Sequence, residues 1–209
     1  MARPGKAQII NRLAGLVLYI YVLCGCSIQD KRTNSSVEPY RLSAEEKALL
    51  QEGDLIMRRG NGMLSSLIVR RLNDTIPVSH CGILVANGDD WAVIHALSLD
   101  VSDTDGVQSC SVDEFMDDCQ TGTLCIVRCV MPRAHCIAPQ ARYYQATHKP
   151  FDRSFNLQDS TAFFCSELPY RILKDRVGLD LTPVSGNLKF SAFFDTRYFE
   201  VIHRGTAYR

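Results

Sequence analysis

The chain has 209 residues, of which 46% are hydrophobic and 22% are charged, and this composition allows one sizeable core. The formal net charge is zero, because 23 Lys and Arg balance 23 Asp and Glu. A nucleic-acid-binding surface needs an excess of basic residues. We therefore predict a globular protein that does not bind nucleic acid.

The first 26 residues have the pattern of a secretion signal. Basic residues precede an apolar run at residues 13–23, which is shorter than a membrane-spanning helix. The run ends in "LCGC" at residues 23–26, which resembles a bacterial lipobox whose last cysteine, Cys26, is lipidated and becomes the new N-terminus. Cys24 departs from the small residues that are commoner at its position. The alternatives are an uncleaved membrane anchor and a plain secretory signal.

These features predict three parts: a lipoprotein signal peptide at 1–26, a polar flexible tether at 27–41, and one folded domain at 42–209. The domain is then expected in the bacterial cell envelope, lipid-anchored and outside the cytoplasm, where disulfides can form. Seven cysteines follow Cys26, so at least one thiol stays free even if the others pair.

The apolar periodicity of the domain predicts helices and strands in mixed order. Two Ser-x-x-Glu capping boxes, starting at Ser43 and Ser111, mark helix starts. The expected elements are, in chain order, helix 43–53, strand 54–59, helix 63–72, strands 78–86 and 91–97, helix 112–118, strand 124–131, helices 138–148 and 165–176, and strand 197–204. Antiparallel hairpins beside helices indicate an α+β domain, with an antiparallel sheet packed on helices.

The hairpin at 78–97 carries two histidines. "NGDD" at 87–90 predicts a tight turn that pairs Ala86 with Trp91. Side chains alternate along strands, so His80 and His95 are expected on the same face of neighbouring strands, close enough for a ring-to-ring hydrogen bond. Either histidine alone is more often a core or surface residue; the pair makes a catalytic role an equal alternative.

Cys165 stands where the extended segment "TAFF" gives way to a helix. A thiol at a helix start meets the positive end of the helix dipole and unpaired N–H groups, which favour thiolate. The alternative is a buried structural cysteine. Cys81 is next to His80 but points to the opposite face, so we expect it in the core.

The other cysteines near the middle of the chain do not form a metal-binding pattern. No CxxC pair occurs among Cys119, Cys125, Cys129 and Cys136, and two of them lie in the strand-like run "LCIVRCVM". We expect them to be small buried apolar residues, and we predict no metal and no cofactor.

Five segments together resemble a known family. "GDLIMRRGNGMLSSLI", "VSHCGILV", "WAVIHAL", "PFDRSF" and "FFCSELPYRIL" follow one another in the order seen in permuted papain-like amidases, the YaeF/YiiX-like branch of the NlpC superfamily. The similarity spans about residues 50–176. It implies a circularly permuted papain-like fold for 42–209, in which the histidine strand precedes the cysteine helix, and an amidase or peptidase activity.

The resemblance carries over Cys165 as nucleophile and His80 as general base. His95 occupies the third position of the site, where many relatives are expected to have Glu. A histidine there is more similar to lecithin:retinol acyltransferase-type enzymes, which use two histidines and a cysteine. The sequence therefore leaves the substrate open between a peptide, including a cell-wall peptide, and a lipid amide or ester.

Four further polar residues are candidates for substrate binding. Arg58, Arg59 and Asn61 follow the first strand and are expected either to line the cleft or to lie in a solvated loop. Asp152, in "PFD", is expected to be a structural cap or a substrate contact. A rival hypothesis is a non-catalytic envelope lipoprotein that binds a peptide or lipid in an inherited cleft.

Overall fold

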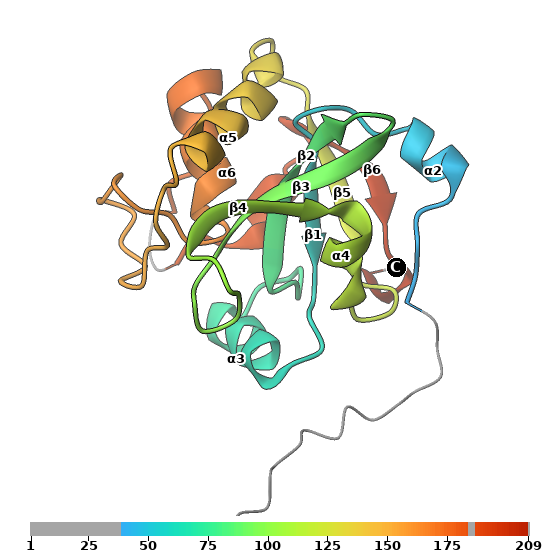
Figure 1. Ribbon diagram of the computed structural model, residues 1–209, viewed down its shortest axis with the longest axis horizontal. Helices are drawn as coiled ribbons and strands as arrows, with labels where there is room; N and C mark the ends of the chain where they lie inside the picture. Colours follow the sequence, from blue (N-terminus) through green and yellow to red (C-terminus); the bar gives the residue numbers. More distant parts are fainter. Residues whose placement is uncertain (1–38, 184–186, 209) are drawn as a thin grey trace, which may run out of the picture. The chain divides into compact units, whose positions relative to one another are not determined.

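A six-stranded antiparallel sheet organises the computed structural model, which describes residues 39–183 and 187–208 (Figure 1). The strands are β1 (Leu55–Arg58), β2 (His80–Asn87), β3 (Asp90–Leu97), β4 (Gly106–Ser111), β5 (Cys125–Cys129) and β6 (Phe199–Arg204). Their order in the sheet is β4-β3-β2-β1-β5-β6. The predicted signal peptide, Cys26 and most of the tether lie outside the described residues.

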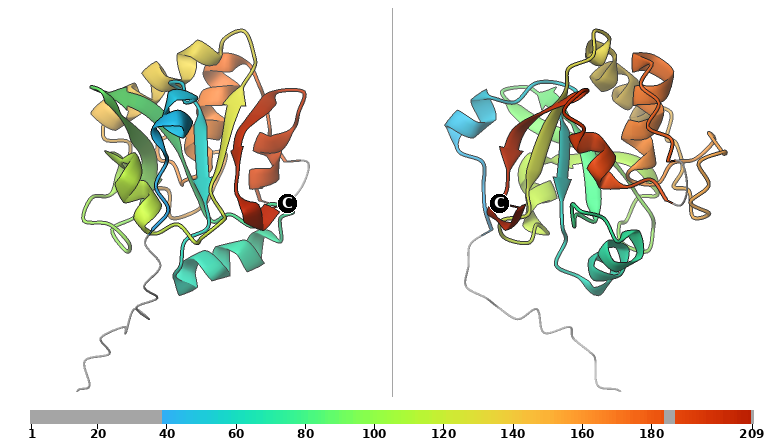
Figure 2. Two further views of the ribbon diagram at one scale, coloured as in Figure 1. Left: turned by 90° about the vertical axis from the view of Figure 1, so that its right-hand side faces the viewer. Right: turned by 180° about the vertical axis from the view of Figure 1, so that it is seen from behind.

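Helices cover both faces of this sheet (Figure 2). They are α2 (Ala44–Ala48), α3 (Met63–Leu72), α4 (Val112–Asp117), α5 (Ile137–Ala146) and α6 (Glu167–Ile172), which continues into a π-helical turn at Leu173–Val177. Helices α5 and α6 pack on one face with the larger apolar core, and α4 packs on the other face with a smaller one. In the described part of the chain, no helix is long and apolar enough to cross a membrane.

The predicted hairpin is confirmed in its register. Ala86 lies opposite Trp91, and the alternation along β2 places Cys81 in the core under α5 and α6. The face with His80 instead carries Leu84 and, on β3, Val93. Gly82 allows this close pairing, because a Cβ there would lie 2.3 Å from a Val93 methyl carbon.

Most predicted elements are present, with shifted ends. Both capping boxes, at Ser43 and Ser111, form as expected. The first helix ends at Ala48 rather than residue 53, and the helix predicted from 165 begins at Glu167. Strand β4 was not predicted, because "GVQSCS" is an edge strand with only its first two residues buried and therefore lacks an apolar pattern.

Candidate active site

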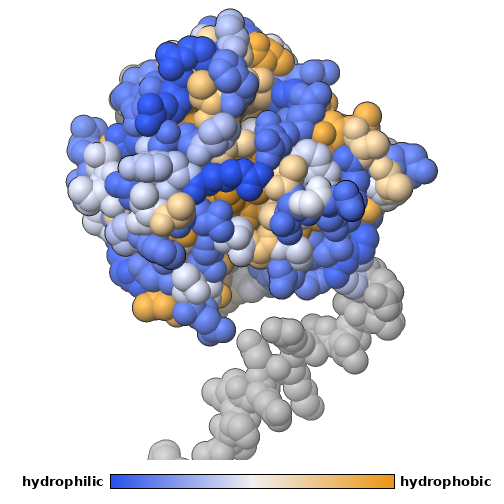
Figure 3. Space-filling view, turned by 45° about the horizontal axis from the view of Figure 1, so that its top comes forward, coloured by the Kyte–Doolittle hydropathy of each residue, from blue (hydrophilic) through white to orange (hydrophobic). Residues whose placement is uncertain are grey.

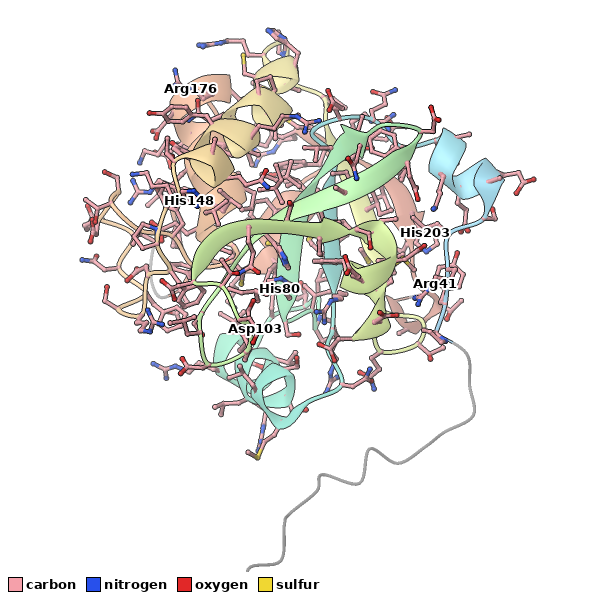
Figure 4. The ribbon with its side chains drawn as sticks, in the orientation of Figure 1. Arg41, His80, Asp103, His148, Arg176 and His203 are labelled. Atoms are coloured by element: carbon pink, nitrogen blue, oxygen red, sulfur yellow. The ribbon has the colours of Figure 1, made fainter. Side chains whose placement is uncertain are left out.

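The two histidines of the hairpin contact each other, as the sequence predicted. His80 Nε2 and His95 Nδ1 are 2.9 Å apart, and both side chains are buried. His80 is the first residue of β2, at the end of the sheet nearest α3, and Figure 4 labels it there, away from the labelled His148 and His203. His80 Nδ1 has no hydrogen-bond partner among the described residues, so one nitrogen of this ring remains available for proton transfer.

The imidazole pair packs against one aromatic ring and one cation. His80 stacks on Phe115 of α4 with ring centroids 5.5 Å apart, and His95 meets the same ring edge-on at 5.8 Å. Arg58 lies opposite His80 in the β1–β2 register, and its guanidinium is 5.0 Å from the Phe115 centroid. Arg58 Nη1 donates to Asp118 Oδ2 at 2.7 Å, which holds the guanidinium there.

These surroundings keep both imidazoles neutral. Burial, then His95 and then the Arg58 cation lower the pKa of His80 well below its ordinary value. Burial and Arg58 lower the pKa of His95 to about 4. At neutral pH, His80 is thus an unprotonated ring that can accept a proton, and its neighbour is a neutral hydrogen-bond partner rather than a counter-ion.

Cys165 lies in the first turn of the α6 segment. The N–H of Leu168 donates to Phe164 O at 3.2 Å, so the helical hydrogen bonding begins around the cysteine although the α-helix proper starts at Glu167. The Cys165 thiol is half-buried and lines a cavity of about 830 Å³. A thiol at this junction therefore faces a space where a substrate can bind.

The nearest contact of Cys165 with the sheet is Cys81, which sequence reasoning placed in the core. Cys81 is buried as expected, but its thiol also donates to Cys165 O at 3.2 Å. Hydrogen bonding from the Cys81 thiol, then from the N–H of Ser166, lowers the pKa of Cys165, although desolvation opposes this. Burial raises the pKa of Cys81 well above its ordinary value, so Cys81 stays the protonated donor.

The turn with Cys165 and the imidazole pair lie at the same end of β2 but on opposite faces of the sheet. Cys165 touches Cys81, and the next residue back along the strand is His80, whose side chain points the other way. No hydrogen bond joins the Cys165 thiol to either imidazole within the described ranges. Such bonds are often long in the absence of substrate and shorten in the complex.

The cavity beside Cys165 has mainly apolar walls. Its lining residues come from α3, from the loop before Cys165, from α6 and from the segment around Leu188. The described apolar members include Leu64, Leu67, Ile68, Leu72, Phe155, Leu157, Phe164, Leu188 and Phe190. The cations Arg71, Arg171 and Lys174 also line it.

The four predicted substrate-binding residues do not line this cavity. Arg58 sits against the histidines, the backbone N–H groups of Arg59 and Asn61 bond to Thr123 and Asp118, and Asn61 is exposed. Asp152 is buried and caps its own loop, since Oδ1 accepts from the N–H of Ser154 at 2.7 Å. This is the cap that the sequence offered as one alternative for Asp152. Substrate contacts by these residues stay predictions.

Glu167, the first residue of α6, forms a buried ion pair with Arg171. Its side chain is fully buried, and Oε1 accepts from Arg171 Nε at 3.0 Å. Burial raises the pKa of Glu167 to about 7 despite this partner. Arg171 in turn donates to the carbonyls of Leu157 and Asp159, so the pair ties the loop that walls the cavity to α6.

Comparison with known proteins gives a family and a fold. The model for "Permuted papain-like amidase enzyme, YaeF/YiiX, C92 family" matches residues 49–189. A crystal structure titled metalloprotein YiiX from Escherichia coli O157:H7 superposes with a TM-score of 0.58 at 18% identity, over 74% of this chain and 97% of that one. Among curated proteins, none matches this sequence.

The thiol environment predicts selective alkylation. Below pH 8, we expect iodoacetamide to modify Cys165 first among the described cysteines, because its pKa is lowered whereas burial raises that of Cys81 and brings that of Cys110 to about 11. Cys81→Ala removes the hydrogen bonding that lowers the pKa of Cys165 and should move the midpoint of the Cys165 pH profile upward; Cys110→Ala should not. Peptide mapping by mass spectrometry measures both. Equal modification of all described cysteines would contradict this.

The histidine pair predicts a specific response to acid. Unfolded histidines bind protons near pH 6.5, whereas His95 in the fold does so only at about pH 4 and His80 also resists protonation. Below about pH 6.5 the unfolded chain therefore binds more protons than the fold at these two rings. Their contribution to the free energy of unfolding is complete above about pH 6.5 and falls as the pH drops below it. Imidazole NMR should show His95 neutral at pH 5.5.

Arg58→Met provides the variant for this titration. Removing the cation should raise the pKa of both imidazoles, because Arg58 lowers each of them in the native protein. A pKa for His95 close to 6.5 in the unaltered protein would show that the ring is not desolvated as described.

Proposed function

We propose, from the membership of this chain in the permuted papain-like amidase family (YaeF/YiiX, C92), that it cleaves an amide bond with Cys165 as nucleophile, His80 as general base and His95 as orienting group. The family is one of cysteine amidases and peptidases, so the activity class follows from membership. The observation that supports the residue roles is the 2.9 Å contact between two buried histidines at the end of the strand next to Cys165.

The proposed reaction begins with transfer of the Cys165 proton to His80. The neutral state of His80 suits this step, and Nδ1 is the nitrogen left free by His95. The thiolate then attacks the amide carbonyl, and backbone N–H groups at Cys165 and Ser166, which favour the thiolate, are positioned to stabilise the oxyanion. His80 returns the proton to the leaving amine, and water hydrolyses the thioester.

His95 differs from a carboxylate in this role. A neutral ring beside His80 stabilises imidazolium less than a negative charge does, and Arg58 opposes imidazolium further. We infer a thiol–imidazole pair that is largely uncharged at rest, in which the base is charged only as the thiolate attacks. Catalysis then depends on the His80–His95 hydrogen bond for ring orientation rather than on an ion pair.

The cellular location of the protein is proposed from its sequence. The lipobox-like "LCGC" at 23–26 supports a lipoprotein of the bacterial envelope, where a cell-wall peptide is one available amide. A lipid amide or ester is the second candidate substrate, and the apolar walls of the cavity favour it.

Activity should depend steeply on the three site residues. With an acyl-aminomethylcoumarin amide as substrate, Cys165→Ala should abolish turnover and His80→Asn should lower kcat/KM about 10²–10⁴-fold, since His80 is the base. His95→Gln should cost less, because it keeps a hydrogen-bonding group. Fluorescence release measures all three.

Two variants control for nonspecific effects. Cys136→Ala removes a thiol distant from the cavity, and His148→Asn replaces an exposed ring whose φ of 49° asparagine tolerates. Both should retain full activity. If Cys165→Ala retains turnover as well, the proposed nucleophile is wrong.

The anchor predicts a simple fractionation result. The full chain expressed in a bacterium should appear in the membrane fraction and incorporate labelled palmitate, whereas Cys26→Ala should do neither, because it lacks the thiol that is lipidated. Cys24→Ala is the matched control and should still be labelled. Palmitate incorporation into Cys26→Ala would contradict the proposed lipidation site.

A further inference from the structure

Helix α3 carries an apolar wall that the rest of the described chain covers only in part. None of its residues is buried, and Leu64 and Leu67 are 51% and 56% exposed. With Ile68 and Leu72, they line the cavity that contains Cys165. Figure 1 shows α3 at the end of the sheet where β2 begins. Large apolar side chains turned toward a hollow mark a binding site for apolar groups.

The opposite wall of the cavity has the same character. Phe164, Leu188 and Phe190 line it, and all three are buried. The face shown in Figure 3 is mostly hydrophilic with scattered apolar patches, whereas apolar side chains line much of the cavity.

Among the cavity cations, Arg71 differs from the other two in its partners within the described residues. Arg171 is held by Glu167 and Lys174 by Asp180, at 3.0 Å each. Arg71, one turn beyond Leu67 on α3, is exposed and makes no ion pair with any described residue. Its charge suits an acidic group on a ligand whose apolar part lies along the same helix.

We infer that the cavity binds the aliphatic acyl chain of the substrate, which is an N-acyl amide bearing an acidic group that pairs with Arg71. This rests on the proposed function for the chemistry. The thiolate of Cys165 forms a bond to the acyl carbonyl carbon, the C–N bond breaks, and the amine leaves with the proton held by His80. Water then cleaves the thioester, releasing the fatty acid and restoring the thiol.

Binding tests the cavity without catalysis. Cys165→Ala protein should bind N-acetyl-, N-hexanoyl-, N-octanoyl- and N-dodecanoylglycine with affinity that rises up to about fourfold per methylene, which corresponds to ~0.8 kcal/mol per buried methylene. Calorimetry measures this slope. Affinity that does not rise with chain length overturns the inference, whatever the enzyme does with other amides.

Variants on α3 test whether this wall causes the gain in affinity with acyl-chain length. Leu67→Asn should reduce the gain per methylene, whereas Met63→Asn, on the same helix and 87% exposed but not lining the cavity, should leave it unchanged. N-dodecanoylglycine should bind about tenfold better than neutral N-dodecanoylglycinamide, and Arg71→Gln should remove that difference. Equal affinity of acid and amide in the unaltered protein overturns the role of Arg71.

Turnover separates this inference from the proposed function. The unaltered enzyme should release glycine from the same series, with kcat/KM rising with chain length. A rising affinity with no turnover of any amide would sustain the acyl site and overturn the proposed catalysis. Turnover of short amides with no preference for long chains would sustain the catalysis and overturn the acyl site.

Discussion

The contact between Cys81 and Cys165 is the interaction on which the site depends. It joins the first turn of the α6 segment to the start of β2, two parts of the chain separated by 84 residues. The same contact places the turn with Cys165, which lines the cavity together with residues of α3 and α6, beside the residue that follows His80 in β2. Because burial keeps the thiol of Cys81 protonated, this thiol donates to the Cys165 carbonyl oxygen, and hydrogen bonding by Cys81 also lowers the pKa of Cys165.

Burial determines the chemistry on the other side of β2. Phe115 covers both imidazoles, and Arg58 adds a positive charge beside them, so neither ring takes up a proton near neutral pH. A carboxylate in place of His95 would raise the pKa of His80, because a negative charge stabilises imidazolium. The site thus has a thiol of lowered pKa and a base of lowered pKa. This combination suits proton transfer as the thiolate attacks more than a thiolate–imidazolium ion pair in the resting enzyme.

The sequence predicted those parts of the site that follow from local pattern. Strand alternation and the "NGDD" turn were sufficient for the His80–His95 contact. The strand-to-helix junction predicted the direction of the Cys165 pKa shift, but its first cause is hydrogen bonding by Cys81, which the sequence did not predict. The hydrogen bond of Cys81 to Cys165 and the ion pair of Glu167 were not predicted, because they depend on contacts between α6, β2 and the loop before α6, which periodicity does not encode. The cavity likewise depends on α3, whose apolar spacing predicted a helix but not which surface it faces.

The most direct measurement is to trap the acyl-enzyme. The enzyme is mixed with an N-acyl amide, quenched in acid within one turnover and digested, and the peptides are analysed by mass spectrometry. The account predicts the mass of the acyl group on the peptide with Cys165, as an adduct that hydroxylamine removes. Product release without such an adduct, or an adduct on another cysteine, would contradict it.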